Sequence, residues 1–361
     1  MSRRSLFGAS IALAAAPAEA FAPRRDRLIA GTYASRGGPG LVPMTATANG
    51  WKAGAPAAAI RNASFGVMSP DRRTRYLLDE QADGALGVYD GSLALRGSFS
   101  TRGADPCHAA LSPDGRILAV ANYSSGSIAL WRIDRDTGLP IGEAQSVAHS
   151  GSGPDPRRQA APHAHWVGFA SGEPLLHAVD LGADAIFAHR VDAMTGRVMG
   201  TATAYHAQPG SGPRHLAWHP TLPMAYLLAE LANTVTVLHA DRDGSFIEGA
   251  TLSTLPAGFE GASSAAHIAV NRAGTRLYLS NRGHDSIAVF AIARDGGLTL
   301  LQHVGCGGHW PRLFLLREQR GELLVANERS GNIAVLRILP DGRLGDPARG
   351  VAIPGVVFLS E

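Results

Sequence analysis

The sequence has very little of several residue types, and each shortage excludes a class of protein. Lys52 is the only lysine among 361 residues, so chemistry that needs a lysine amine has a single candidate. The two cysteines, Cys107 and Cys306, are too few for a disulfide scaffold or a cysteine-rich zinc protein. A formal net charge of +3 is too small to indicate nucleic acid or an anionic membrane as partner. No apolar run is long enough to cross a bilayer.

Glycine and hydrophobic residues are abundant. The chain contains 43 glycines and 22 prolines, which favours many turns, and therefore many short strands, over a helical bundle. Hydrophobic residues make up 45% of the chain, which excludes wholesale disorder.

The N-terminus has the features of an export signal. Arg3 and Arg4 form a twin arginine, residues 8–16 are a short apolar run, and residues 18–20 fit a small-x-small cleavage site. We expect residues 1–20 to be a twin-arginine-type signal peptide and residues 21–361 to form the mature domain. This predicts a periplasmic or secreted protein that has no membrane attachment after cleavage.

One motif recurs along the rest of the chain: an apolar run, a polar residue, a short turn and a second alternating run. Copies lie at Leu118–Asp134, Leu175–Asp192, Ala225–Asp241, Leu277–Ile292 and Leu323–Ile338, with weaker copies upstream. The aligned polar residues are Thr32, Glu80, Asn122, Asp180, Glu230, Asn281 and Asn327. The longest interval between them contains an insertion, residues 149–161, rich in glycine, serine and proline. The chain is therefore a sevenfold repeat.

Each repeat also has an upstream strand and, after an Asp-Gly or Thr-Gly turn, a downstream edge strand. Four short strands repeated seven times predict an all-β fold, a seven-bladed β-propeller. Period-2 alternation opposes a helical solenoid, the competing repeat architecture. The first repeat lacks an upstream strand, and the C-terminal run Val351–Leu359 lacks partners. We expect this C-terminal strand to join the N-terminal blade and close the ring.

Polar residues are expected to converge on one mouth of the central channel. The innermost strand and its neighbour form an antiparallel hairpin, so the start of the first and the end of the second lie on the same face. Starts of inner strands supply His108, His165, His215 and His267, and the residues just before these starts include Cys107, Arg214 and Arg312. Ends of second strands supply Glu80, Asn122, Asp180, Glu230, Asn281, Arg282, Asn327 and Glu328. Such a ring of polar groups indicates contact with water or a ligand.

Structural interpretations compete with this one. Any of the four histidines could cap backbone groups, Asn122 could be a turn former, and Cys107 could be a small buried residue. Glu230 could pair with Arg214 or Arg282 for structural reasons alone. Long charged side chains on a channel rim must nevertheless be paired or solvated, and this mixture suits an anionic substrate beside a general acid or base. The histidine spacing is unspecific for a metal, and we predict neither metal nor cofactor.

Several segments resemble one family, the seven-bladed propeller lactonases, which include cycloisomerase-type 6-phosphogluconolactonases and carboxymuconate-lactonizing enzymes. The resemblance spans essentially the whole mature chain, and its motifs occur in order. They are Pro162–His165, Asp180–Asp184, Gly212–His215, Glu230–Val235, Ser280–Ile287 and Pro311–Arg312.

The resemblance implies site residues. A histidine of the Pro-His-x-His segment, either His163 or His165, would line the active site together with Arg214, Glu230 and Arg282. One departure concerns His267, which stands where relatives often have an acidic residue, and this difference is expected to affect substrate choice.

These observations give a mechanistic hypothesis. Arg214 and Arg282 would bind a sugar lactone and stabilise the oxyanion, while Glu230 or His165 takes a proton from the attacking water. The residues predicted to bind the substrate are His163, His108, His215, His267, Asp180, Asn122, Arg312 and Asn281. Export favours an unphosphorylated lactone as the substrate. We also expect the enzyme to be a monomer. A carboxymuconate-type cycloisomerase and an exported propeller without enzymatic activity, acting as a binding module, remain the alternatives.

Overall fold

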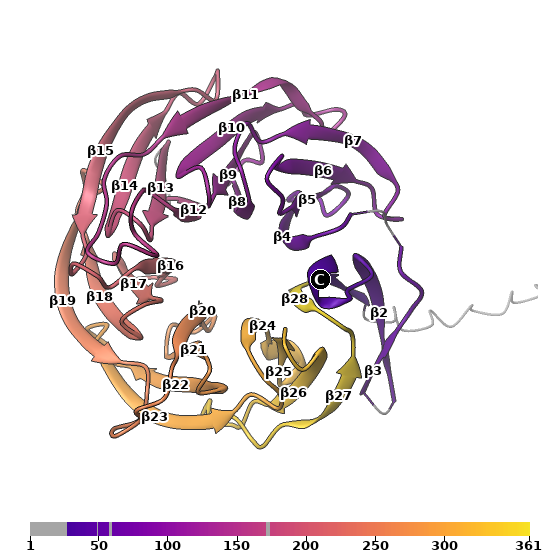
Figure 1. Cartoon of the computed structure of the whole chain (residues 1–361), viewed down its shortest axis with the longest axis vertical. Helices are drawn as coiled ribbons and strands as arrows, with labels where there is room; N and C mark the ends of the chain where they lie inside the picture. Colours follow the sequence, from indigo (N-terminus) through magenta and orange to yellow (C-terminus); the bar gives the residue numbers. More distant parts are fainter. Residues whose placement is uncertain (1–26, 49, 58–59, 171–173) are drawn as a thin grey trace, which may run out of the picture.

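The computed structural model describes residues 27–361, except residues 49, 58–59 and 171–173. The predicted signal peptide, residues 1–20, and residues 21–26 of the predicted mature domain lie outside the described residues. Seven four-stranded antiparallel sheets in the described part of the chain are arranged in a ring around a central axis (Figure 1). The predicted seven-bladed β-propeller is confirmed.

Each of the first four blades runs outward from an innermost strand at the channel. Blade one consists of β28 (Val356–Ser360), β1 (Arg27–Thr32), β2 (Leu41–Thr47) and β3 (Gly50–Ala53). Blade two consists of β4 (Ala63–Met68), β5 (Arg75–Asp79), β6 (Ala85–Tyr89) and β7 (Leu95–Ser100). Blade three consists of β8 (Pro106–Leu111), β9 (Ile117–Asn122), β10 (Ser127–Ile133) and β11 (Pro140–Ala148). Blade four consists of β12 (Ala164–Phe169), β13 (Leu175–Asp180), β14 (Ala185–Val191) and β15 (Val198–His206).

The last three blades have the same order of strands. Blade five consists of β16 (Pro213–Trp218), β17 (Met224–Ala229), β18 (Thr234–Ala240) and β19 (Phe246–Ser253). Blade six consists of β20 (Ser264–Val270), β21 (Arg276–Arg282), β22 (Ser286–Ile292) and β23 (Leu298–Gly305). Blade seven consists of β24 (Pro311–Arg317), β25 (Glu322–Asn327), β26 (Asn332–Arg337) and β27 (Ala348–Ala352). Two short 3-10 helices, η1 (Ala34–Arg36) and η2 (Glu318–Arg320), lie in loops. No helix within the described ranges is long and apolar enough to cross a membrane.

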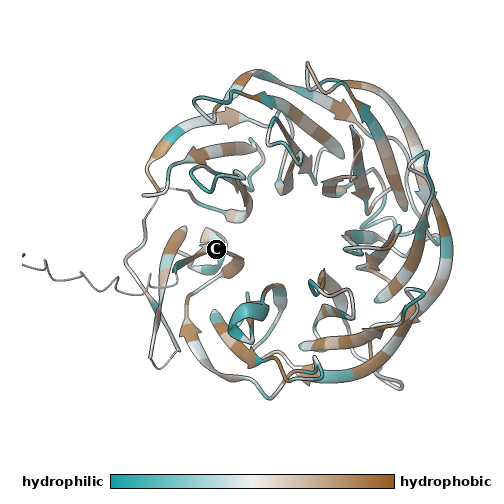
Figure 2. Cartoon of the chain, turned by 180° about the vertical axis from the view of Figure 1, so that it is seen from behind, coloured by the Kyte–Doolittle hydropathy of each residue, from teal (hydrophilic) through white to brown (hydrophobic). Residues whose placement is uncertain are grey.

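The hydrophobic core consists of clusters between neighbouring blades. The second strand of a blade can be buried on both faces; for example, every residue of β9 and β17 is buried. The outermost strands are mostly exposed or half-buried, because one side of each faces solvent. In Figure 2 much of the hydrophobic colour lies on the strands, and hydrophilic stretches lie largely in the turns. Radial closure leaves each blade only a short outer edge to protect.

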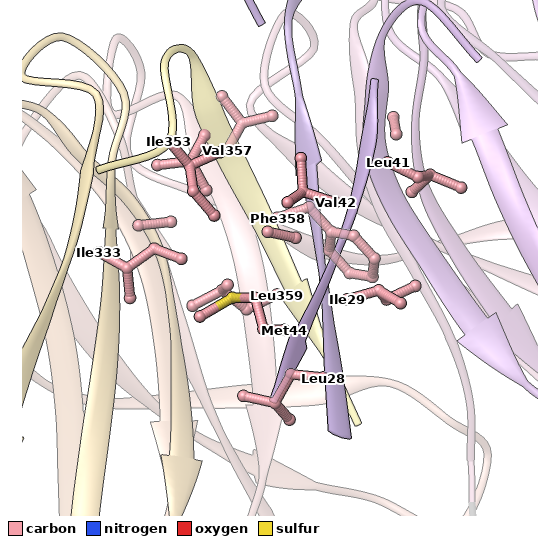
Figure 3. Close-up of a cluster of buried hydrophobic side chains, with 14 of the residues drawn as sticks. Leu28, Ile29, Leu41, Val42, Met44, Ile333, Ile353, Val357, Phe358 and Leu359 are labelled. Atoms are coloured by element: carbon pink, nitrogen blue, oxygen red, sulfur yellow. The ribbon is translucent and has the colours of Figure 1, made fainter. Parts of the chain in front are cut away.

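The ring is closed by pairing of the C-terminal and N-terminal strands. β28 runs antiparallel to β1, with Ala30 opposite Leu359 and Gly31 opposite Phe358. Figure 3 shows Phe358 and Leu359 packed among side chains of the first blade, with Ile333 of blade seven nearby. The expected closure is thus confirmed, with one correction. The run Val351–Leu359 is divided, because Val351 belongs to β27 and only Val356 onward forms the closing strand.

The closing strand makes a measurable contribution to stability. Val357 is 1% exposed within the cluster that joins the first and last blades. Val357→Ala removes two buried methyl groups, so we expect the free energy of unfolding to fall by about 2 kcal/mol. Urea denaturation measures this loss. The control is Ile247→Ala on the outer strand β19, where the side chain is 61% exposed and a change within about 0.5 kcal/mol is expected. Equal effects of the two substitutions would contradict the proposed role of β28.

Candidate active site

The innermost strands of blades two to seven each contain an extra residue close to one mouth of the channel. In blade five, Pro213 pairs with Ala229 but His215 pairs with Leu228, so Arg214 is the additional residue. A β-bulge of this kind bends a strand and re-aims a side chain. The residues at the six bulges are Ser64, Cys107, His165, Arg214, Ala266 and Arg312. Equivalent positions around the ring therefore carry a thiol, an imidazole and two guanidinium groups.

The bulges correct the alignment that the sequence suggested. His165 is equivalent to Arg214, because Trp166 occupies the position that His215 has in its own blade. Glu230 lies one residue beyond Ala229, which is the true equivalent of Asn122. The residues equivalent to Glu230 in the other blades are Tyr33, Glu80, Tyr123, Leu181, Arg282 and Glu328, of which Arg282 is itself paired, with Ser264. Tyr33 and Tyr123 were missed because the alignment was displaced by one residue.

Glu230 is the centre of a cluster of guanidinium groups. Arg214 Nε donates a hydrogen bond to Glu230 Oε2 at 3.0 Å, and Arg282 Nη2 lies 2.8 Å from the same oxygen. Both side chains come from the channel mouth, Arg214 from a bulge and Arg282 from the end of β21. The Glu230 side chain is only 6% exposed. This buried arrangement brings together three of the four residues predicted to be catalytic.

Arg158 is the third arginine of the cluster and was not predicted. Its Nη2 donates hydrogen bonds to Glu230 Oε1 at 2.7 Å and to the Tyr123 hydroxyl at 3.2 Å. Arg158 belongs to the insertion of residues 149–161, and its side chain is 38% exposed. Long insertions in repeat proteins often carry binding residues, and that general signal could have drawn attention to the arginines of this segment. With Arg158 included, three cations surround one carboxylate.

Four imidazoles lie next to the arginine cluster inside the channel. The ring centroid of His215 is 5.3 Å from that of His165 and 5.4 Å from those of His108 and His267. Arg214 Nη1 lies 2.9 Å from His215 Nε2, which links the histidines to the arginines. The structure therefore brings His165, His108, His215 and His267 together as predicted.

Burial determines the charge of these imidazoles. Desolvation lowers the pKa of His165 and His215 well below the ordinary histidine value, and the nearby Arg214 cation lowers both further. Burial likewise lowers the pKa of His108 well below that value and the pKa of His267 to about 3. All four rings are therefore neutral at pH 7 and are able to accept a proton.

Opposing effects determine the charge of the arginine–glutamate cluster. Burial alone would raise the pKa of Glu230, but Arg282 and Arg214 outweigh burial and hold it well below the usual range. Burial and the neighbouring Arg282 lower the pKa of Arg214 to about 9, so Arg214 is still cationic at pH 7. Glu230 is thus a carboxylate at all ordinary pH values, and both of its oxygens are already engaged by arginines, so neither is open to a proton of the attacking water.

His163 and Arg312 lie in the surroundings of the cluster. The His163 ring stacks on Tyr123 with centroids 4.5 Å apart, and Tyr123 in turn touches Arg158. Arg312 belongs to a separate charged group, 3.6 Å from Glu80 and 4.0 Å from Glu328. Arg312 also lies over the Tyr33 ring at 4.9 Å, and the Tyr33 hydroxyl donates to Glu80 at 2.7 Å. This second group offsets its own charges, unlike the cluster around Glu230.

Three predicted substrate-binding residues are fully buried and bonded to neighbouring loops. The side chains of Asp180, Asn122 and Asn281 belong to residues with 0% exposure. Asp180 accepts hydrogen bonds from the backbone N–H groups of His163 and Ala183, and its other oxygen lies 2.7 Å from His149 Nδ1.

The two asparagines hold loops in place. Asn122 donates to the Thr101 carbonyl, and Asn281 donates to the Thr254 carbonyl. These contacts fix the strand ends on which the mouth residues stand. We therefore leave Asp180, Asn122 and Asn281 out of the proposed site.

The imidazole that pairs with Asp180 is that of His149, which is not one of the four channel histidines. Among the described residues, no three His, Cys, Asp or Glu side chains are grouped so that they could share a metal ion. The two cysteines are buried free thiols, and burial raises the pKa of each. Cys107 Sγ lies 3.7 Å from His165 Nδ1, so this thiol supports the imidazole and is a poor nucleophile.

Fold and site together define a seven-bladed propeller with a polar, arginine-rich channel mouth. The family model "Lactonase, 7-bladed beta-propeller" matches residues 27–360. The chain belongs to this lactonase family.

Individual relatives agree with this assignment. The chain is 33% identical over 310 residues to a Bacillus subtilis protein named 6-phosphogluconolactonase, covering 82% of this chain and 86% of the relative. Among solved structures, the periplasmic gluconolactonase of Pseudomonas aeruginosa superposes with a TM-score of 0.85 at 28% identity, covering 92% and 98% of the two chains. A putative 6-phosphogluconolactonase from Bacteroides fragilis gives a TM-score of 0.85 at 26% identity, covering 95% and 99%.

Proposed function

We propose that this chain hydrolyses an unphosphorylated sugar lactone at the channel mouth around Glu230. The observation that supports this most directly is the position of neutral His165 beside an arginine cluster with excess positive charge. Hydrolysis of a lactone needs an acceptor for one proton of the attacking water and stabilisation of the oxyanion that forms at the carbonyl carbon. The product is a carboxylate, which the same cations would bind.

His165 is the proton acceptor in this proposal. Its ring is neutral at pH 7, and its Nδ1 faces the buried Cys107 thiol. No residue of the described ranges forms a hydrogen bond with its Nε2, which leaves that nitrogen for the attacking water. The water adds to the carbonyl carbon as its proton passes to Nε2. The ring oxygen then leaves with a proton from the imidazolium, which regenerates neutral His165 and yields a hydroxy acid.

Glu230 acts in this scheme by positioning the arginines. Its two oxygens hold Arg214, Arg282 and Arg158 at 2.7–3.0 Å. A guanidinium carries five N–H donors, so each arginine keeps donors for the substrate after binding Glu230. Arg158 is the most exposed of the three, and a lactone arriving from solvent meets it first. His163, stacked on Tyr123, borders this entry side.

Two observations support an unphosphorylated substrate. The relative from Pseudomonas aeruginosa is named a periplasmic gluconolactonase, and the N-terminal residues of this chain have the pattern of an export signal. Phosphorylated sugar lactones are metabolites of the cytosol. Because the Bacillus subtilis relative is named 6-phosphogluconolactonase, the phosphorylated lactone is the substrate to compare in the same assay.

The test is hydrolysis of glucono-1,5-lactone by the mature chain, followed by pH-stat with and without a chelator. We expect turnover above the spontaneous rate that survives chelation, and a higher kcat/KM than for the 6-phosphorylated lactone. Loss of activity on chelation would overturn the metal-free mechanism. A preference for the phosphorylated lactone would overturn the substrate assignment. No turnover of either lactone would favour a cycloisomerase or a binding module.

Arg214→Gln should reduce kcat/KM for the lactone by about 100-fold, the usual cost of removing one oxyanion donor from a preformed site. Glutamine keeps much of the length of the side chain but lacks the charge. The control is Arg132→Gln, an exposed arginine of β10 remote from the mouth, which should leave kcat/KM unchanged. Equal activity of the Arg214 variant and the control would exclude Arg214 from oxyanion stabilisation.

A further inference from the structure

The channel has a second opening on the face opposite to the Glu230 cluster. A cavity of about 920 Å³ lies there, lined by the ends of inner strands and by the turns that follow them. Residues of four blades line it, among them Arg272 of blade six, Arg317 of blade seven, Glu361 of blade one and Arg72 of blade two. The catalytic mouth is formed by the starts of inner strands, so the two openings are at opposite ends of the channel. The volume is in the range of small-molecule sites.

The inner wall of this cavity is apolar and aromatic. Phe65, Phe314 and Leu313 line it, and the two phenylalanines pack against imidazoles of the channel. The Phe65 ring lies 4.1 Å from that of His108, and the Phe314 ring lies 4.8 Å from that of His267. His267 itself lines the cavity, and its Nδ1 is 3.3 Å from that of His215. The packed histidines therefore separate this cavity from Arg214 and Glu230.

The outer part of the cavity has an excess of positive charge. Five arginines and two glutamates line it: Arg27, Arg72, Arg272, Arg317 and Arg320, with Glu318 and Glu361. Both carboxylates are already engaged. Glu318 accepts a hydrogen bond from the Arg272 backbone N–H at 2.7 Å, and Glu361 pairs with Arg317 at 3.0 Å.

The guanidinium groups of two of these arginines, Arg27 and Arg272, form no ion pair with an acidic side chain of the described residues, and both side chains are exposed. Arg72 makes only a 4.0 Å contact with Glu361. An anion entering the cavity would therefore meet cations that no described carboxylate neutralises, which favours its binding electrostatically. The apolar inner wall adds a preference for a ligand that carries a ring or chain behind its anionic group.

We propose that this second opening is a binding site for a small molecule with one anionic group, a carboxylate, sulfonate or phosphate, attached to an apolar ring. The anionic group binds at the exposed arginines of the outer part, Arg27 and Arg272, and the ring packs against the half-buried side chains of Phe65 and Leu315. This site is independent of lactone hydrolysis, because none of these four residues takes part in the proposed reaction.

Fluorescence titration of the mature chain with anilinonaphthalene sulfonate tests the proposal, since this probe combines a sulfonate with aromatic rings. We expect saturable binding of one probe per chain. The double variant Arg27→Gln/Arg272→Gln should raise the Kd at least about tenfold, because charge-assisted contacts are the stronger class of hydrogen bond. The neutral probe N-phenylnaphthylamine, which lacks the sulfonate, should bind at least tenfold more weakly than the sulfonate.

The matched control is Arg132→Gln/Arg190→Gln, which removes two exposed arginines from β10 and β14, outside the channel. It should leave the Kd unchanged, and thermal melting of all variants confirms that each is folded. An equal Kd for both double variants, or unsaturable binding, would overturn the proposal. Equal affinity for the neutral probe would show that the arginines contribute nothing.

Discussion

His165→Asn should lower kcat/KM for glucono-1,5-lactone by about 100- to 10,000-fold, the usual contribution of a positioned general base. Asparagine is polar and similar in breadth, so the substitution removes the proton acceptor with little change in packing. Initial rates by pH-stat, corrected for spontaneous hydrolysis, measure the loss. His239→Asn is the control, since His239 is exposed on β18 and far from the mouth. A fall of less than tenfold for His165→Asn would mean that another group takes the proton.

The pH profile gives an independent measure of the same role. Burial, followed by the Arg214 cation, lowers the pKa of His165 well below 6.5, and the ring must be neutral to accept a proton. Activity should therefore stay constant as the pH falls through 6.5, where an ordinary histidine would be half protonated. The decline should begin only at lower pH. An acid limb with its midpoint near 6.5 would assign the reaction to a histidine without this burial.

Glu230→Gln should lower the free energy of unfolding by about 3–5 kcal/mol at pH 7, as expected when one partner of a buried ion pair is removed. The substitution leaves Arg214 and Arg282, which are 3% and 7% exposed, without a neutralising charge. It should also abolish most of the activity, because the arginines lose the group that positions them. Urea denaturation and lactone hydrolysis measure the two effects.

Glu143→Gln is a matched control for the stability effect. Glu143 also pairs with an arginine, Arg102, at 2.6 Å, but its side chain is 85% exposed. An exposed pair contributes little, so a change of at most about 1 kcal/mol is expected. Full lactone hydrolysis by Glu230→Gln would refute its role in positioning the arginines.

Acid should remove the contribution of Glu230 in a defined pH window. The pKa of Glu230 is lowered in the folded state, so its stabilisation is complete above the ordinary value of 4.5 and is lost as the pH falls toward the lower folded value. The stability gap between the wild type and Glu230→Gln should shrink below pH 4.5 by about 1.4 kcal/mol per pH unit. A gap that stays constant between pH 4.5 and 3 would show that the carboxylate is not stabilised in its ionised form.

The fold was predictable because it repeats. Alternating hydrophobicity and regularly spaced turns report strand pairing locally, and seven copies remove the ambiguity of any single one. The unpaired run at residues 351–359 indicated ring closure for the same reason. Its exact division between β27 and β28 depends on one turn, Ile353–Gly355, that pattern alone does not resolve.

The candidate site was predictable where residues stand close to the ends of the repeated strands. Arg214, Glu230 and Arg282 were identified from their places near strand ends, and the structure brings them within hydrogen-bond distance. Alignment by pattern failed at the bulges, because one extra residue per inner strand moves the neighbouring side chain to another direction. Asp180 and Asn122 were misplaced for a related reason, because each stands one residue before the position equivalent to Glu230. Arg158 was missed because an irregular insertion has no periodicity from which its position could be read.

Closure of the ring by β28 has a consequence for biosynthesis. Blades two to seven are each built from neighbouring segments of the chain, and each can form soon after it leaves the ribosome. Blade one has three strands from the beginning of the domain and one from its end, so it stays incomplete until β28 is made. Its innermost position is occupied last, after a loop closure that spans nearly the whole domain. During translation the first blade therefore exposes an unpaired edge at β1, which is open to chaperones or to pairing with a second copy.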